Sequence, residues 1–335
     1  MKAYSSARDE FEGEAEVFLD ANENALGSAA SGHFNRYPDP HHKALKERWS
    51  ALKGVGQERI FFGNGSDEPI DLLIRLFCEP GKDYIITLPP TYGMYKVSAS
   101  INAVENKLVP LTPDFELDMP ALTSAWDEHA KLLFLCSPNN PSGNLLRRQD
   151  MHELIKSFPG IVVVDEAYID FSPEASWIDE LEKYPNLVVL QTLSKAWGMA
   201  GIRVGVAMGD PYVIAMLEKI KPPYNLSLAN QQLALEAMAN HEKQKNHVQT
   251  LLAEREKLIH ALEGVEQVRK IVPSAANFLL VEFDRADELF HFMIERGVIV
   301  RNRTRELHCE GCLRVTVGTS AENQRFLTLV NDFYA

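Results

Sequence analysis

The chain has few cysteines, no long apolar run and no apolar start. Four cysteines among 335 residues are too few for a disulfide framework and suit a reducing compartment. No apolar run approaches the roughly 20 residues that cross a bilayer, and the first twenty residues lack the apolar core of a signal peptide. We therefore expect a cytoplasmic protein that has no membrane partner.

Positive charge is also scarce. Lys and Arg number 34 against 47 Asp and Glu, which gives a net charge of −13. A molecule of this charge repels phosphate backbones and anionic lipid surfaces, which disfavours a general role in nucleic-acid or membrane-surface binding. A few arginines or helix N-termini can still bind a small anion inside an acidic protein, and any anion site must therefore be local.

Short apolar runs predict the strands of the first two thirds of the chain. They are rich in β-branched residues, show no apolar/polar alternation, and are separated by helix-like segments, without any internal repeat. Strands of this kind are covered on both faces, which is typical of an α/β fold with a mostly parallel central sheet and helices on both faces. The runs lie at residues 83–88, 131–136, 161–164, 187–192 and 203–208.

The last third of the chain predicts a smaller α+β domain. Residues 227–263 contain neither Gly nor Pro and are too long for one ordinary helix, so we expect a break near Asn240 and a second long helix after it. We predict a large α/β domain over residues 33–241 and a small domain formed by residues 1–32 and 242–335. The small domain is expected to hold strands at 278–283, 298–301 and 313–317, a helix at 285–296 and a terminal helix from Ala321.

Lys195 is the first candidate for covalent chemistry. It comes just after the expected buried strand 187–192, with Thr192 and Ser194 before it and Arg203 eight positions later. A lysine that forms a Schiff base needs a partly desolvated pocket in which the neutral amine is accessible. A lysine considered alone is more often a solvated surface charge.

Asp165 is the second candidate. It follows the apolar run 161–164, and the carboxyl ends of parallel strands are where α/β folds place their ligands. A carboxylate there could pair with the protonated ring nitrogen of pyridoxal phosphate. The alternative is a cap of the next helix.

Gly65, Ser66 and Asp67 form a glycine-rich turn before an amphipathic run at residues 70–77. Such a turn can leave backbone N–H groups free to bind a phosphate, with Thr192, Ser194 and Arg203 completing the site, although Ser66 or Asp67 could equally be an ordinary helix cap. Two further turns follow expected strands. Tyr92 could stack on a planar ring or be a core residue, and Asn140 lies in a turn at residues 136–143.

Seven motifs together resemble a known family. SPNNPSG at 137–143, VDEAY at 164–168 and TLSKAWGMAGIR at 192–203 resemble fold-type I pyridoxal-phosphate aminotransferases. LDANEN at 19–24, RYPDP at 36–40, GNGSDE at 63–68 and CLRVTVGT at 312–319 are similar to the histidinol-phosphate aminotransferase family in particular. The resemblance runs from about residue 18 to the end, and it implies the fold-type I PLP-transferase fold.

The resemblance implies a role for each matching residue toward pyridoxal 5′-phosphate. Lys195 would bind the cofactor covalently and move a proton between Cα and C4′, and Asp165 would pair with the pyridine nitrogen. Tyr168 and Asn140 would hydrogen-bond the ring hydroxyl, and Tyr92 would stack on the ring. The implied phosphate ligands are Gly65, Ser66, Asp67, Thr192, Ser194 and Arg203.

Other implied residues concern the substrate and a second subunit. Tyr37 would reach the cofactor phosphate of the neighbouring subunit, which implies a homodimer with shared sites. Arg314 and Arg301 would bind the substrate's distal anion, although Arg314 could form only a surface salt bridge. Asn22 would belong to an N-terminal lid over the substrate. The chain departs from the family pattern at Ala25, where proline is usual, and at Trp197, where phenylalanine is more usual.

The implied activity is a ping-pong transamination that converts L-histidinol phosphate and 2-oxoglutarate to imidazole-acetol phosphate and L-glutamate, a step of histidine biosynthesis. Three alternatives stay open: a threonine-phosphate decarboxylase, an aromatic or branched-chain aminotransferase, and a non-enzymatic module of the same fold. Cys309 and Cys312 have the spacing of a zinc half-site, but no second such pair exists, so we expect no metal site.

Overall fold

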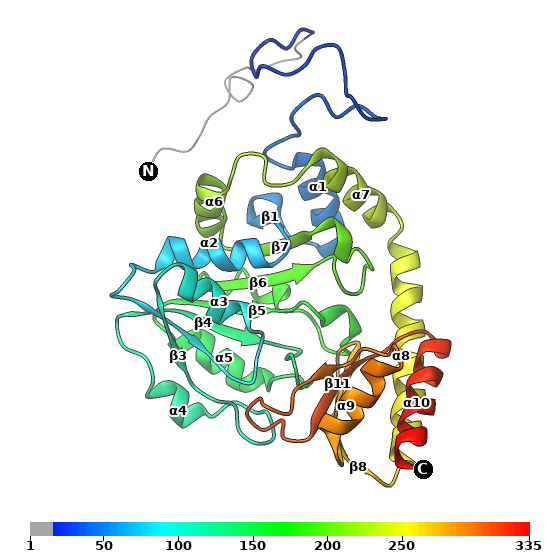
Figure 1. The fold of residues 1–335 in the computed structure, drawn as a ribbon. Helices are drawn as coiled ribbons and strands as arrows, with labels where there is room; N and C mark the ends of the chain where they lie inside the picture. The colour runs from blue at the N-terminus through cyan, green and yellow to red at the C-terminus, as the bar shows by residue number, and fades with distance from the viewer. Residues whose placement is uncertain (1–15) are drawn as a thin grey trace.

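Two sheets form the framework of the molecule (Figure 1). The computed structural model describes residues 16–335, so residues 1–15 of the predicted N-terminal lid lie outside the described residues. The larger sheet has seven strands in the order β1-β7-β6-β5-β4-β2-β3. Its strands are β1 (Ile60–Asn64), β2 (Tyr84–Thr87), β3 (Glu105–Leu108), β4 (Ala130–Cys136), β5 (Ile161–Asp165), β6 (Leu187–Thr192) and β7 (Val204–Gly209).

The larger sheet is mostly parallel, as predicted. Strands β6, β5, β4, β2 and β3 run parallel to their neighbours, and only β7 pairs antiparallel, with β6 and with β1. Cys136 at the end of β4 is the register partner of Asp165 at the end of β5. The carboxyl ends of these strands therefore meet at one edge, where open α/β sheets bind their ligands.

Helices cover both faces of this sheet, which confirms the predicted α/β class. On β4, Leu132 and Phe134 pack into one core and Leu133 and Leu135 into the other, and all four are fully buried. Burial on both faces explains why the strands read as continuous apolar runs. One face holds α2 (Asp67–Phe77), α3 (Met94–Ile101) and α6 (Pro211–Ile220), and the other holds α1 (Lys43–Lys53), α5 (Arg148–Ser157) and α7 (Leu228–Ala239).

The smaller sheet is antiparallel and has the order β10-β11-β9-β8. Three helices pack on it through an apolar core that includes Leu258, Leu289 and Phe326. This part confirms the predicted α+β arrangement of elements. Its elements are α8 (His241–Glu263), β8 (Val268–Ile271), β9 (Phe278–Phe283), α9 (Ala286–Glu295), β10 (Arg301–Asn302), β11 (Cys312–Thr316) and α10 (Ser320–Tyr334).

The remaining regular elements are short. They are α4 (Met119–Thr123) and the 3₁₀ turns η1 (Gln57–Arg59), η2 (Ile169–Phe171), η3 (Trp177–Glu180) and η4 (Ala200–Ile202). None of the helices in residues 16–335 is long and apolar enough to cross a membrane.

Helix boundaries in the C-terminal third follow the sequence closely. Asn240 separates α7 from α8, as predicted, and a capping box between Thr319 and Glu322 starts α10 one residue before the predicted position. The strand predicted at residues 298–301 is wrong in its extent, since β10 begins only at Arg301.

A small apolar cluster joins the two sheets. The ring of Tyr168, which follows β5, meets the ring of Phe278 in β9 edge-on, with centroids 5.1 Å apart. The described part of the N-terminal segment, from residue 16 on, lies at the α1 and α7 end of the molecule, away from the smaller sheet (Figure 1). The division into domains at residues 33–241 stays a prediction.

Candidate active site

A cavity of about 540 Å³ lies where the carboxyl ends of β5 and β6 face the smaller sheet. Five cationic side chains line it, Lys195, Arg203, Arg301, Arg303 and Arg314, against two carboxylates, Asp67 and Asp165. The acidic protein therefore has the local positive site that its composition permitted. The predicted site residues that it brings together are Ser66, Asp67, Tyr92, Asn140, Asp165, Tyr168, Thr192, Ser194, Lys195, Arg203, Arg301 and Arg314.

Lys195 projects into this cavity from the loop after β6. Its Nζ lies 5.6 Å from the centroid of the Tyr168 ring, and no acceptor in residues 16–335 is within hydrogen-bond distance. The side chain is open toward the cavity, yet the surrounding protein desolvates the amine. This burial, with Arg314 as the next cause, lowers the pKa of Lys195 below its ordinary value. The neutral, nucleophilic form is therefore more accessible than in a surface lysine.

Asp165 ends β5 and is almost fully buried. Its Oδ2 accepts a hydrogen bond of 2.6 Å from the Tyr95 hydroxyl, and its Oδ1 accepts one of 3.1 Å from the Ala167 amide. Burial raises the pKa of Asp165 above its ordinary value. A carboxylate in such a site gains most from a cationic partner, such as a protonated ring nitrogen.

Tyr95 is a site residue that the sequence did not reveal. It lies in α3, is fully buried, and stacks on Phe134 with centroids 4.6 Å apart. Its hydroxyl contacts Asp165, which is 70 positions away in the sequence. No local motif marks such a contact, because the packing of α3 on the sheet creates it.

A chain of hydrogen bonds crosses the cavity between the two sheets. Arg314 Nη1 donates to Asn140 Oδ1, and Asn140 Nδ2 donates to the Tyr168 hydroxyl at 3.3 Å. Burial raises the pKa of Tyr168, so its hydroxyl stays protonated at neutral pH. Tyr168 can therefore donate its proton to an acceptor on a bound ring.

The turn between β1 and α2 has the geometry of an anion cradle. Gly65 has a φ of +75°, and Ser66 occupies the N-cap position of α2 without a side-chain capping bond. Arg203 reaches the turn with Nη2 3.3 Å from Asp67 Oδ2, and its Nη1 lies 3.3 Å from Ser194 Oγ. A Cβ on Gly65 would lie 2.4 Å from Arg203 Nη2, so only glycine allows this approach. Thr192 Oγ1 lies 3.0 Å from Ser194 Oγ.

The edge of the cradle carries an aromatic side chain. The Tyr92 hydroxyl donates to Asp67 Oδ1 at 2.9 Å, and the Tyr92 ring packs edge-on against Tyr95 with centroids 5.5 Å apart. Tyr92 is thus half-buried in the cavity wall, where its ring can cover a planar ligand.

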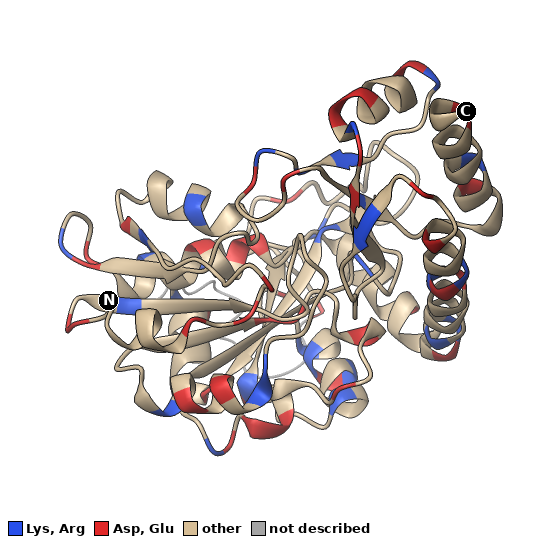
Figure 2. Cartoon of the chain, turned by 90° about the horizontal axis from the view of Figure 1, so that it is seen from below, with Lys and Arg blue, Asp and Glu red and all other residues tan. Residues whose placement is uncertain are grey.

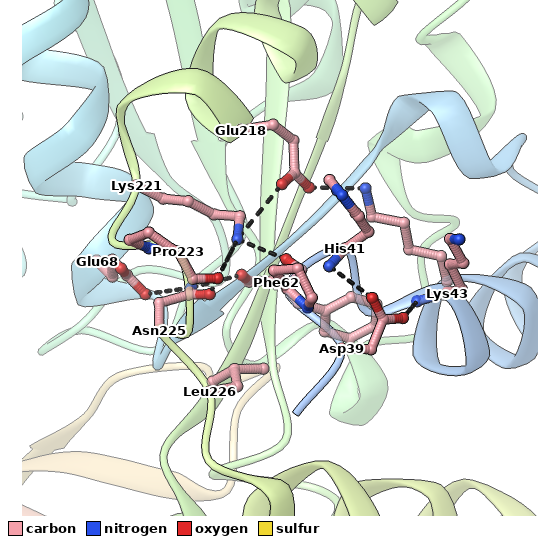
Figure 3. Close-up of polar contacts among 12 residues, drawn as sticks. Asp39, His41, Lys43, Phe62, Glu68, Glu218, Lys221, Pro223, Asn225 and Leu226 are labelled. Carbon is pink, nitrogen blue, oxygen red and sulfur yellow. Dashed lines mark hydrogen bonds and ion pairs between the residues drawn. The ribbon is translucent and has the colours of Figure 1, made fainter. Parts of the chain in front are cut away.

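A partly buried polar network holds the same turn from behind (Figure 3). Glu68 Oε2 accepts from the Asn64 amide at 2.5 Å and from Asn225 Nδ2 at 2.8 Å, and Asn225 Nδ2 also lies 3.0 Å from the Phe62 carbonyl. The buried ammonium of Lys221 donates to the Pro40 carbonyl at 2.6 Å. Lys221 Nζ also donates to Asn225 Oδ1 at 3.4 Å, so the network connects the cradle to Pro40, just before α1.

Gly205 in β7 offers a test of the cradle. A Cβ there would lie 2.2 Å from the Ser66 amide nitrogen and 2.3 Å from the Gly65 carbonyl carbon, and backbone atoms cannot rotate away. We expect Gly205→Ala to displace the turn and weaken binding of the expected cofactor, pyridoxal phosphate, roughly 10- to 100-fold, because overpacking of this kind costs about 1–3 kcal/mol. Absorbance titration of the apoenzyme measures this. Gly201→Ala is the matched control, because nothing lies within 4 Å of its added Cβ; equal affinity in both variants would contradict the expectation.

Three predicted site residues do not line the cavity. Gly65 lies behind it, with Arg203 between them, whereas Asn22 and Tyr37 line a second cavity of about 460 Å³. There the Tyr37 ring stacks on Tyr224 with centroids 4.4 Å apart. The structure of one chain therefore leaves the roles of Asn22 and Tyr37 as predictions.

Two other sequence features lie away from the chemistry. Trp197 does not line the cavity, since its ring packs against Trp49 and stacks on His241. Cys309 and Cys312 are buried free thiols, and burial raises the pKa of each to about 12. No group of three possible metal-binding side chains occurs in residues 16–335.

Comparison with known proteins identifies the family. Residues 9–330 match the family model of aminotransferase class I and II. The chain is 50% identical over 332 residues to the histidinol-phosphate aminotransferase of Cytophaga hutchinsonii, a match covering 99% of this chain and 95% of that one. It is also 50% identical over 332 residues to the histidinol-phosphate aminotransferase of Parabacteroides distasonis, with the same coverage of 99% and 95%. The chain belongs to the histidinol-phosphate aminotransferase family.

Solved structures show the same fold for this family member. The histidinol-phosphate aminotransferase from Clostridium acetobutylicum has a TM-score of 0.82 at 21% identity, covering 90% of this chain and 91% of that one. The enzyme from Sinorhizobium meliloti, solved with pyridoxal-5′-phosphate, has a TM-score of 0.82 at 23% identity, covering 93% and 90%. The predicted family and fold are confirmed.

Proposed function

We propose that the chain transfers the amino group of L-histidinol phosphate to 2-oxoglutarate, giving imidazole-acetol phosphate and L-glutamate, as a step of histidine biosynthesis. The observation that carries the proposal is the placement of Lys195 between two anion-binding groups. One is the cradle at Ser66 and Arg203, and the other is the pair Arg301 and Arg314 from the smaller sheet. A phosphorylated cofactor and a phosphorylated substrate need these two groups.

The cavity fits pyridoxal phosphate as its cofactor. Ser66 at the N-cap position of α2 and Arg203 both border the cavity, as a phosphate site requires, and Gly65 lets Arg203 approach the turn. Asp165 is a buried carboxylate that suits a cationic ring nitrogen, and Lys195 is a desolvated amine that suits an aldehyde. When bound, the cofactor supplies the carbonyl that accepts the amino group and a ring that withdraws electrons from the substrate's Cα–H bond.

The chain's own residues perform the proton transfers and hold the charges. Lys195 Nζ removes the proton from Cα of the donor, and its lowered pKa favours the neutral amine that this requires. Asp165 keeps its partner nitrogen protonated, and Tyr95 and Ala167 fix the carboxylate in position. The walls of the cavity replace bulk water around these groups, which strengthens each electrostatic interaction.

Arg314 and Arg301 are proposed to bind the distal anion of each substrate. They are register partners across β10 and β11 and both line the cavity. A guanidinium can fork onto a phosphate or a carboxylate, so the same pair can serve donor and acceptor in turn.

Steady-state kinetics with competing donors tests the proposed reaction. We expect histidinol phosphate to be used with a kcat/KM roughly 10- to 100-fold above that of unphosphorylated histidinol, since hydrogen bonds to a charged group contribute about 1.5–3 kcal/mol. Aromatic amino acids serve as comparison donors, and release of carbon dioxide from threonine phosphate measures the competing decarboxylase activity. Equal use of histidinol, or carbon dioxide release without transamination, would refute the proposal.

We propose further that the enzyme is a cytoplasmic homodimer in which Tyr37 enters the partner's site. Support comes from the place of Tyr37, half-exposed on a cavity outside its own chain's active site and braced by Tyr224. Mixing Lys195→Ala subunits with Tyr37→Phe subunits should form hybrid dimers with one intact site. Recovery of activity above that of either variant supports the shared site, and no recovery in proven hybrids opposes it.

A further inference from the structure

One arginine of the cavity is not among the site residues that the sequence predicts. Arg303 lines it together with Arg301 and Arg314. The Arg303 amide donates to the Cys312 carbonyl at 3.0 Å, so the pairing with β11 continues beyond the end of β10. Because side chains alternate along a strand, Arg301 and Arg303 share a face, and Arg314 is the Cα partner of Arg301. Figure 2 shows several blue Lys and Arg segments on this smaller sheet.

Three guanidinium groups on one face of a hairpin do not stabilise the fold. Like charges opposite each other in a sheet repel. In the part of the chain that the structure describes, no carboxylate forms an ion pair with Arg301 or Arg314, and Arg303 pairs only with Glu306. The face therefore carries more positive charge than neighbouring carboxylates neutralise, and a bound anion would relieve the repulsion.

The guanidinium of Arg303 has N–H groups that donate no hydrogen bond within residues 16–335. Nη1 donates to Glu306, whereas Nε is buried and has no hydrogen-bond partner within residues 16–335. Leaving a buried N–H unpaired costs roughly 1–3 kcal/mol. Arg303 also contributes, after burial, to the lowered pKa of Arg314, which places the two charges close together.

We propose that Arg303 is a specificity-determining residue that favours the phosphate of the donor over the distal carboxylate of the acceptor. A phosphate monoester carries a charge of about −1.5 to −2 and three acceptor oxygens, whereas a carboxylate carries one charge and two oxygens. Arg301 and Arg314 suffice for the carboxylate. The third guanidinium finds a free oxygen only on the phosphate. This role rests on the proposed function, because it concerns the two substrates named there.

The two half-reactions of the holoenzyme separate the substrates. In single-turnover measurements we expect Arg303→Gln to weaken apparent binding of histidinol phosphate roughly 10- to 100-fold, as the loss of a charge-assisted hydrogen bond does. The glutamate half-reaction should change by less than about 3-fold and reports that the variant is folded. Arg303→Lys keeps the charge without the fork and should fall between. Arg305→Gln is the matched control: Arg305 is exposed, lies in the same loop and does not line the cavity, so its loss should alter neither half-reaction.

Inorganic phosphate as an inhibitor of the glutamate half-reaction gives an independent readout. Its inhibition constant should rise in Arg303→Gln and stay unchanged in Arg305→Gln. Equal losses in both half-reactions, an equal effect of Arg305→Gln, or unchanged phosphate inhibition would each overturn the role of Arg303. If the wild-type enzyme did not transaminate histidinol phosphate, the proposed function would be overturned instead. Inhibition by phosphate would still report whether Arg303 selects phosphate.

Discussion

Replacement of Lys195 by alanine is expected to lower turnover by at least ~10⁴-fold, because in the proposed site this one amine both binds the cofactor covalently and moves the substrate proton. The loss should appear in kcat as well as in kcat/KM, since no neighbouring base can take over. Asp67, Asp165 and four arginines are the other charged groups that line the cavity. In the proposed site these groups bind the cofactor and the substrate's anion and transfer no proton. Steady-state kinetics and borohydride reduction followed by peptide mass mapping measure the two functions separately.

Lys82→Ala is the matched control for this experiment. Lys82 is an exposed lysine that pairs with Glu79 on the surface, so its removal should leave turnover and the borohydride-trapped peptide unchanged. A Lys195→Ala enzyme that retained a tenth of the activity, or that still yielded a trapped lysyl adduct, would refute the assignment.

The central strands around the site were predictable because their burial is uniform, whereas β1, which leads into the cradle and is also mostly buried, was not predicted. β4 and β5 lie inside the sheet with helices on both faces, so their sequences are continuous apolar runs. β3, Glu105–Leu108, was not predicted, since an edge strand is half-exposed and its residues show no apolar run. β8 was not predicted for the same reason, since its residues are only partly buried or exposed.

The cofactor end of the site was also largely predictable. Asp165 directly follows one predicted strand, Lys195 comes three residues after another, and parallel pairing of β5 and β6 brings their carboxyl ends together. Tyr95 and Arg303 were missed for a common reason. Packing of α3 brings the Tyr95 hydroxyl to Asp165, and antiparallel register brings Arg303 to the cavity, so each contact joins residues distant in the sequence and no local motif indicates it.

Asp165→Asn is expected to lower kcat by roughly 10²- to 10³-fold, the range for removing one preorganised electrostatic contact to a developing charge. An amide cannot hold a ring nitrogen in its protonated form as a carboxylate does, so the ring withdraws electrons less effectively. Cofactor binding should weaken less than turnover, because Arg203 and Ser66 remain. Kinetics and the cofactor's absorbance as a function of pH measure both effects; unchanged kcat would exclude the role of Asp165.

The same variant changes stability in a defined direction with pH. Burial raises the pKa of Asp165 in the folded apoenzyme, so near that pKa the folded chain keeps a proton that the unfolded chain has lost. The free energy of unfolding therefore falls as pH rises from the ordinary aspartate pKa through the raised one. Asp165→Asn lacks this fall, so its stability relative to wild type should grow with pH in denaturant titrations of the apoenzyme.

Tyr95→Phe separates the carboxylate's charge from its positioning. The change removes the 2.6 Å hydrogen bond to Asp165 Oδ2 and leaves the ring stacked on Phe134. We expect kcat to fall roughly 10-fold in the wild-type background, as for one hydrogen bond to a charged group, and hardly at all in the Asp165→Asn background. A double-mutant cycle measures this coupling. Additive losses would show that Tyr95 acts on the reaction without Asp165. A coupling of the expected size means that the buried tyrosine orients the Asp165 carboxylate, and this carboxylate is what lets the cofactor ring withdraw electrons in the proposed reaction.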